Sequence, residues 1–224
     1  MTLLTRRPDP VVSCRLYCRI GQTRLIATPM KIQLTLVVSF LLALHSVANA
    51  DPAVKADFST ATLPETWAGM KGEWKVVDGA LVGAELESDE HAAVFSIPDP
   101  HKDSTISFRF RLDGAKGFNL SYNHPKGHLF RVTLVGDVLT LAMDKDKKDP
   151  ASKAEVLGKE TLTLKPGEWT EMSCSLTGDT AKVTCGGKTI SGTHANLAKE
   201  KTGYRLVVQG ASVGFDDVAF TSTK

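Results

Sequence analysis

Apolar and polar residues alternate in short runs along much of the chain. In the segment STISFRFRLDG (residues 104–114), Ile106, Phe108 and Phe110 alternate with serine and arginine. Because successive side chains of a strand point to opposite faces of a sheet, this pattern predicts a strand with one buried face. The same alternation recurs in two later segments, 118–123 and 128–143. The pattern therefore indicates strands rather than helices.

Turn residues separate these runs. Asp78-Gly79 lies between two short apolar runs, which is the strongest short-range signal of a β-hairpin. Two further turns are expected at Gly136-Asp137 and Pro166-Gly167. About ten to twelve short strands with such turns are typical of a β-sandwich or jelly roll. The predicted fold class is therefore all-β.

An export signal is predicted before the strand-rich part. The run at 34–44 is apolar, Met30 and Lys31 precede it, and positions 48–50 carry an A-x-A motif. This is the pattern of a secretory signal peptide that is cleaved after Ala50. A retained membrane anchor is the alternative, but the run is shorter than the roughly 20 apolar residues that a bilayer requires.

The chain is expected to hold one folded domain. Residues 1–29 are interpreted as an over-extended start outside the fold, 30–50 as the signal peptide, and 51–224 as a single β-sandwich domain. In the alternative of a genuine long basic leader, Cys14 and Cys18 would invite a metal or redox role. Export places the protein in the periplasm or outside the cell, and both stay open. No lipid anchor is expected, because no cysteine follows the cleavage site.

The charge of the predicted domain differs from that of the whole chain. Of 27 basic and 25 acidic residues, 21 and 24 remain after residue 50, so the net charge becomes −3. These charges are spread along the sequence without blocks. Phosphate backbones are bound by clustered cations, so this distribution argues against nucleic acid as a partner.

Two cysteines remain in the predicted domain. The segment EMSCSLTGDTAKVTCGG predicts a hairpin centred on Asp179-Thr180, which sets Cys174 opposite Cys185 on the inward face. In an oxidising compartment this arrangement predicts a disulfide between them. Two buried free thiols that fill core space are the alternative.

Five segments carry a resemblance to a known family: WKVVDGALVG, GHLFRVTL, DKDKKDPASKAEVLGK, PGEWTEM and THANLAKEKTGYRLVVQGASVGFDDVAF. Together they resemble one bacterial family, the secreted 3-keto-disaccharide hydrolase-like domains of planctomycete type. These domains are related to laminin-G and concanavalin-like sandwiches, and the resemblance covers nearly all of residues 53–221. It implies a concanavalin-like jelly roll of two antiparallel sheets with adjacent first and last strands, and a role in handling glycans. GFNLSYNHPKGH stands where better-known members carry a strand followed by N-S-G-I-x-x-R.

The densest set of directional hydrogen-bonding side chains lies between residues 118 and 131. Sugar hydroxyls are recognised by such donors and acceptors beside an apolar ring, which Tyr122 or a nearby tryptophan could supply. A solvated hairpin rim around Pro125-Lys126-Gly127 is the alternative. The predicted ligand-binding residues are Asn119, Ser121, Tyr122, Asn123, His128 and Arg131.

Three groups of acidic residues are candidates for a catalytic or metal site. The segment ELESDE (residues 85–90) faintly resembles the acidic strand of sandwich glucanases, but it is better explained as an acidic turn. Asp216-Asp217 is explained by a bulge or by a twist of the closing strand. No cofactor motif is present after residue 50, and calcium is the metal that stays open. Its candidate ligands are Asp144, Asp146 and Asp149.

Three functions from different classes are consistent with the sequence. The first is a glycan-binding or interaction module whose partner is a glycan or small saccharide. The second is a glycoside hydrolase that acts on (3-keto-)disaccharides or related glycans, as the resemblance implies, although the sequence offers no convincing pair of catalytic acids. The third is a structural envelope protein.

Overall fold

The computed structural model describes residues 54–224. The predictions for the over-extended start and the signal peptide lie outside these residues. The described part consists of antiparallel strands and two short 3₁₀ helices. No helix within it has the length and apolar character needed to cross a bilayer. The elements are β1 (Val54–Ala56), β2 (Ala68–Lys71), β3 (Glu73–Val77), β4 (Ala80–Ala84), η1 (Glu87–Asp89), β5 (Ala93–His101), β6 (Asp103–His124), β7 (Gly127–Val135), β8 (Val138–Met143), β9 (Glu155–Thr161), β10 (Thr170–Thr177), β11 (Thr180–Cys185), β12 (Lys188–Thr193), η2 (Ala195–Ala198) and β13 (Lys201–Thr223).

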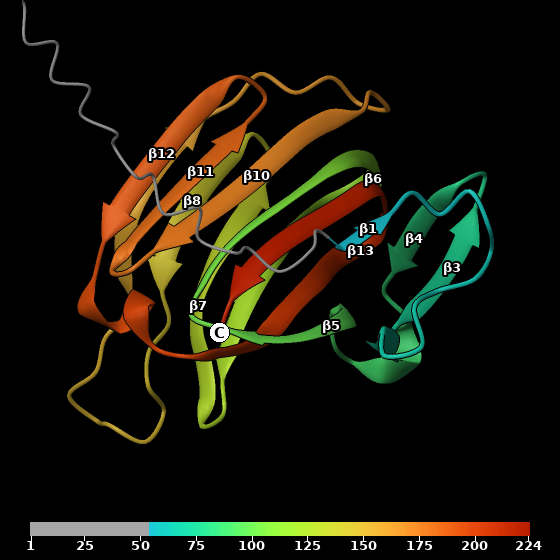
Figure 1. The fold of residues 1–224 in the computed structure, drawn as a ribbon. Coiled ribbons are helices and arrows are strands. Elements are labelled where there is room, and N and C mark those ends of the chain that lie inside the picture. Colours follow the sequence, from blue (N-terminus) through green and yellow to red (C-terminus); the bar gives the residue numbers. More distant parts are fainter. Residues whose placement is uncertain (1–53) are drawn as a thin grey trace, which may run out of the picture. The chain divides into compact units, whose positions relative to one another are not determined.

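Two long strands, β6 and β13, organise the fold (Figure 1). They pair with each other along most of their length, and each takes part in two sheets. The first half of β6 pairs with β10, whereas its second half pairs with β7. Sheet A therefore runs β12-β11-β10-β6-β13-β4-β3, with β1 also on β13. Sheet B runs β9-β8-β7-β6-β13-β5-β2.

Glycines mark the region where the two long strands pass from one sheet to the other. Gly114 and Gly210 have φ of 86° and 88°, and the register between β6 and β13 shifts around them. At Gly117 a Cβ atom would lie 1.9 Å from the carbonyl oxygen of Leu134. Side chains other than hydrogen are disfavoured at such bulges and close approaches, so these glycines allow both strands to bend together.

Aromatic side chains fill the space between the sheets. Phe118 from the second half of β6 meets Phe215 from the second half of β13 edge to face, with ring centroids 5.3 Å apart. Phe108 and Phe110 pack on the same pair. All four side chains are buried. The alternation predicted from residues 104–114 is thus confirmed, because its apolar positions point into this core.

The edge strands β9 and β12 close one side of the sandwich. A Cβ atom on Gly192 would lie 2.4 Å from Cβ of Leu157, and one on Gly158 would lie 3.2 Å from Cβ of Ile190. Glycine on each strand therefore lets the other approach closely. The antiparallel two-sheet sandwich confirms the predicted fold class, and the pairing of β1 with β13 confirms the expected adjacency of the first and last strands.

The hairpin at Asp78-Gly79 is confirmed, with φ of 50° and 75° at its two central residues. The predicted register of the cysteine hairpin is wrong. Its turn is centred on Gly178-Asp179, with Gly178 at φ 56°, a conformation that glycine adopts readily.

This turn lies one residue earlier than predicted, which shifts the pairing by two residues. Cys174 stands opposite Val183, and Cys185 stands opposite Met172. Both cysteines are buried and free. The predicted disulfide is therefore replaced in the structure by two core thiols.

Candidate functional site

Polar side chains from three neighbouring strands form rows on the outer face of sheet A. Ser173 on β10 stands opposite Ser107 on β6 and Thr184 on β11. Two residues along, Glu171 stands opposite Arg109. A groove of 660 Å³ lies over these rows, and we call it the Trp169 groove. It is lined by Ser107, Phe108, Arg109, Trp169, Thr170, Glu171, Met172, Ser173, Thr184, Gly186, Gly187 and Asp217.

Trp169 packs on the sheet beside two arginines. The guanidinium carbon of Arg109 lies 5.4 Å from the indole centroid, and that of Arg111 lies 4.9 Å from it. A Cβ atom on Gly214 would lie 3.3 Å from the ring. Cation–π attraction and the missing side chain at Gly214 therefore fix the half-buried indole on this face.

Arg109 is also paired with two acids from β13. Its Nη2 lies 2.5 Å from Oδ2 of Asp216, and its Nε lies 2.6 Å from Oδ2 of Asp217. Both carboxylates reach one guanidinium because β13 bulges there, with Asp217 at φ 50°. The predicted bulge is confirmed. Since both aspartates are paired with arginine, Glu171 is the carboxylate of the groove that has no arginine ion pair among residues 54–224.

The ligand-binding residues predicted from sequence lie on sheet B instead. Asn119, Ser121 and Asn123 occupy the outer face of β6 and are 4%, 6% and 7% exposed. Ser121 stands between Arg205 of β13 and Arg131 of β7. Long side chains on the two neighbouring strands thus flank the short ones in the middle.

Tyr122 points the opposite way, into the core. It is fully buried and stacks on Phe130 with ring centroids 4.3 Å apart. It shares the inward phase of β6 with Phe118 and Leu120. The prediction that Tyr122 supplies a sugar platform is therefore wrong.

Asn123 links the predicted histidine to an arginine that the sequence did not single out. In the amide orientation that satisfies both neighbours, its nitrogen donates to His128 Nδ1 at 3.0 Å. Its oxygen accepts from Arg205 Nε and Nη1, at 2.9 and 3.0 Å. Burial lowers the pKa of His128. Three of the predicted residues, Asn123, Ser121 and His128, are thus brought together with Arg205.

The three calcium candidates each have a local partner. Asp144 forms a two-point ion pair with Arg131, with Nη2–Oδ1 at 2.5 Å and Nε–Oδ2 at 3.1 Å. Asp146 and Asp149 accept backbone N–H groups of their own loop, both at 2.9 Å. Within residues 54–224 no three acidic, histidine or cysteine side chains gather as metal ligands. These aspartates are therefore used to shape the loop after β8.

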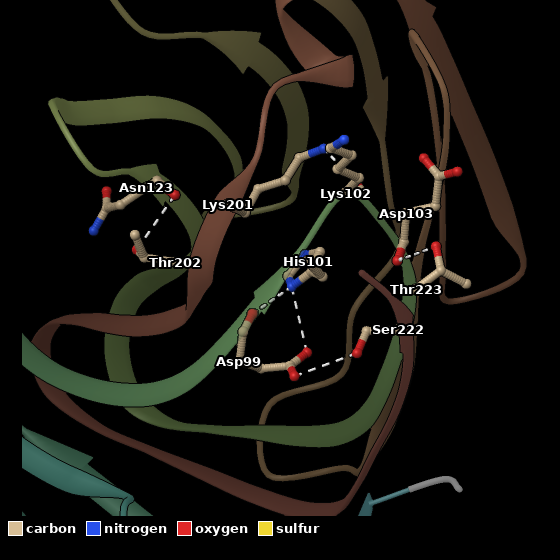
Figure 2. A network of polar contacts seen from close by, with 9 residues as sticks. All are labelled: Asp99, His101, Lys102, Asp103, Asn123, Lys201, Thr202, Ser222 and Thr223. Carbon is tan, nitrogen blue, oxygen red and sulfur yellow. Dashed lines mark hydrogen bonds and ion pairs between the residues drawn. The ribbon is translucent and has the colours of Figure 1, made fainter. Parts of the chain in front are cut away.

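A buried polar network, shown in Figure 2, lies where β5, β6 and β13 meet. Lys201 is fully buried, and its Nζ donates to the carbonyl oxygens of Lys102, at 2.6 Å, and of Leu197. Burial lowers the pKa of Lys201 to about 8. The ammonium group of Lys201 is buried and donates to two carbonyl oxygens of the chain itself. This lysine therefore holds η2 to β13 and is not exposed to a ligand.

The other half of the network centres on His101. Its Nδ1 lies 2.6 Å from the carbonyl oxygen of Asp99 and 3.3 Å from Oδ2 of the same residue. Ser222 donates to the other carboxylate oxygen of Asp99 at 3.3 Å. His101 is 1% exposed and stacks on Tyr204. This histidine is therefore also an internal structural group. Figure 2 shows its contacts with Asp99.

The sequence reasoning did not find Trp169, Arg205 or Lys201. For Trp169 a signal existed, since it follows the Pro166-Gly167 turn and Arg109 lies on the polar phase of its strand. Trp169 and Arg109 come together because β6 pairs with β10. Local sequence patterns do not predict this pairing. For Arg205 and Lys201 the sequence offers no comparable signal.

Comparisons with known proteins identify the fold. No family model matches the chain, and no curated protein sequence matches it. The carbohydrate-binding module CBM66 from Bacillus subtilis is 14% identical, with a TM-score of 0.55 over 70% of this chain and 95% of that one. The CBM2 module of the evolved Dit protein of Lactobacillus casei BL23 phage J-1 is 11% identical, with a TM-score of 0.58 over 75% and 95%. The laminarinase from Rhodothermus marinus is 10% identical, with a TM-score of 0.56 over 75% and 96%. At such identities the likeness concerns the fold, and the chain shares the β-sandwich of these proteins.

Proposed function

We propose that this protein is an exported glycan-binding module whose sugar-binding surface is the Trp169 groove. The observation that carries the proposal is the indole of Trp169, which contacts Arg109 and Arg111 at a groove lined with hydroxyl and charged side chains. The fold adds support, because two of the similar structures are described as carbohydrate-binding modules.

The groove has the two chemical elements that sugar recognition requires. A pyranose ring presents an apolar C–H face, which stacks on an aromatic ring, and a rim of hydroxyls, which need directional donors and acceptors. Trp169 supplies the first. The second comes from Glu171, Ser173 and Thr184, beside an Arg109 that Asp216 holds in place. Since these groups are already oriented by the sheet, little side-chain ordering is needed on binding.

Hydrolysis of the glycan is the second candidate function, and it is the one that the resemblance to the 3-keto-disaccharide hydrolase-like domains implies. Retaining glycosidases use two carboxyl groups about 5 Å apart, one of which must give up a proton. Asp217 lines the Trp169 groove but, like Asp216 beside it, is paired with Arg109. The groove therefore offers Glu171 no second carboxylate that is free of an ion pair. This arrangement favours binding without cleavage.

Export is part of the proposal. It is supported by the signal-peptide pattern at residues 30–50, and it places the module in the periplasm or outside the cell. N-terminal sequencing of protein recovered from the culture medium and from the periplasm would test it. We expect a mature start at Asp51, whereas a start that retains residues 34–44 would contradict export by a cleaved signal.

A glycan array with the purified protein, with and without calcium, tests the binding proposal. The variant Trp169→Ala should lose binding by at least roughly fivefold, because stacking of a sugar's C–H face on an aromatic ring is worth on the order of 1 kcal/mol or more. Met70→Ala is the control, since Met70 is a 61% exposed apolar side chain on β2, away from the groove. Product analysis of every bound glycan separates the two candidates, because cleavage would support the hydrolase. Binding to no glycan would favour a structural envelope protein.

A further inference from the structure

Lysine side chains gather around one pocket at the end of sheet B. The pocket has a volume of 220 Å³ and lies between the β6–β7 hairpin, the loop after β8 and η2. These segments are far apart in sequence, so the gathering is produced by the fold. The lining residues are His124, Lys126, Gly127, His128, Leu129, Met143, Asp144, Lys145, Asp146, Lys147, Lys148, Ser152, Asn196 and Lys199. We call this the lysine pocket.

The positive charge of the lysine pocket is not neutralised within the described part of the chain. Its five lysines form no ion pair among residues 54–224. Of its two acids, Asp144 is engaged by Arg131, and Asp146 accepts the backbone N–H of Lys148. The cations therefore outnumber the acids even before Arg131 is counted.

One further cation, Arg205, is linked to a lining residue of the pocket. His128 lines the pocket and is linked through Asn123 to Arg205, whose guanidinium contacts an amide oxygen rather than a carboxylate. The chain after residue 50 carries a net charge of −3. A positive pocket on a negatively charged domain concentrates the field at one place, which is how proteins attract anionic ligands.

We infer that the lysine pocket binds the anionic substituent of an acidic polysaccharide, a sulfate ester or a carboxylate. Lysine ammonium groups act as mobile point charges that can close around either group from several sides. The volume lies below the range of about 300 to 1,000 Å³ that is usual for pockets that enclose a drug-sized ligand, so it suits one charged sugar residue rather than a chain segment. The inference rests on sheet B and is independent of the Trp169 groove on sheet A.

Affinity electrophoresis of the purified protein through gels that contain a polysaccharide tests this inference. The probes are dextran sulfate, polygalacturonate and neutral dextran, which separate sulfate, carboxylate and uncharged glycan. We expect retardation by at least one of the two acidic polymers and none by dextran. Binding should weaken at least about tenfold between roughly 50 and 500 mM NaCl, because exposed charges are screened over this range.

A charge-matched pair of variants separates the pocket from general attraction. The triple variant K145Q/K147Q/K148Q should lose at least about tenfold in affinity for the acidic polymer, whereas K71Q/K159Q/K182Q removes the same charge elsewhere and should change it less than about twofold. Each substituted lysine is exposed, so both triples should fold.

Two results would overturn the inference. One is an equal loss in both triple variants, or retardation by neither acidic polymer. The other is binding of double-stranded DNA that is as tight as binding of the acidic polysaccharide and is weakened as much by K145Q/K147Q/K148Q. That result would make the pocket a general polyanion site.

Discussion

Arg109 contacts Trp169 and Asp216 at the same time: its guanidinium carbon lies 5.4 Å from the indole centroid, and its Nη2 lies 2.5 Å from the Asp216 carboxylate. The three residues come from β6, β13 and the segment before β10. One side chain thus joins the aromatic platform to the acids beside it. The Trp169 groove should therefore respond to the geometry of Arg109, and not only to its charge.

Arg109→Lys tests this relationship. Lysine keeps the charge but lacks the planar fork that contacts two carboxylates and stacks on an aromatic ring. We expect glycan affinity to fall by roughly tenfold, and stability to change by less than about 1 kcal/mol because the pair is partly exposed. Calorimetric titration and urea unfolding measure the two effects. Unchanged affinity, together with a loss in Trp169→Ala, would show that Arg109 does not position the ring.

Gly214→Val should displace the indole without touching the polar groups of the groove. A Cβ atom at Gly214 would already lie 3.3 Å from Trp169, so the two further methyl groups of valine would meet the ring. Valine suits a strand, which limits the cost to the fold. We expect a red-shifted tryptophan emission and loss of glycan binding with a cooperative unfolding transition retained. Normal binding by this variant would mean that the ring position is not needed.

Lys201 should make stability depend on pH in a defined window. Its pKa falls from 10.5 to about 8 on burial, near Asp103 and Cys174. Between these values the unfolded chain binds more protons than the folded chain, so stability rises with pH there and this contribution is constant below pH 8. Between pH 8 and pH 10.5 the free energy of unfolding of the wild type should rise by up to about 3 kcal/mol relative to that of Lys201→Met.

Urea unfolding at several pH values between 7 and 10.5 checks this expectation. The difference between the two proteins removes the titration of groups that they share, such as the buried thiols. Lys102→Met is the control, because Lys102 enters the network through its carbonyl oxygen and its side chain is exposed. Parallel pH profiles for wild type and Lys201→Met would contradict the burial of this charge.

Cys174 and Cys185 should be free but unreactive in the folded protein. Burial raises the pKa of Cys174 to about 11 and that of Cys185 to about 12, and the thiolate is the reactive form. Alkylation without reductant should leave both unlabelled in the native state and label both after unfolding in urea. Peptide mapping by mass spectrometry locates the labels. A peptide pair joined through the two sulfurs would contradict the structure.

Local patterns were sufficient where neighbours along the chain determine the conformation. The alternation at residues 104–114 identified a strand and its inward face, and Asp78-Gly79 identified a hairpin, because strand periodicity and turn geometry are short-range properties. The same rules also account for one error. Tyr122 lies in the inward phase of Phe118 and Leu120, so the alternation itself placed it in the core.

The position of a turn within a hairpin was less well determined. Moving the turn from Asp179-Thr180 to Gly178-Asp179 shifts every pair by two residues and separates Cys174 from Cys185. The sequence permits both turns, and glycine at positive φ decides between them. A long-range consequence, the disulfide, thus depended on one local choice.

The sequence by itself determined the all-β fold class, several strands and their buried faces, since each is read from a few adjacent residues. Only the tertiary structure decided that Arg109 contacts both Trp169 and Asp216 at one groove, and that lysines from three segments surround one pocket. The physical reason is that these contacts depend on which strands pair and in which register. That choice is made by the packing of both sheets around a common core, with β6 and β13 bent to serve them both.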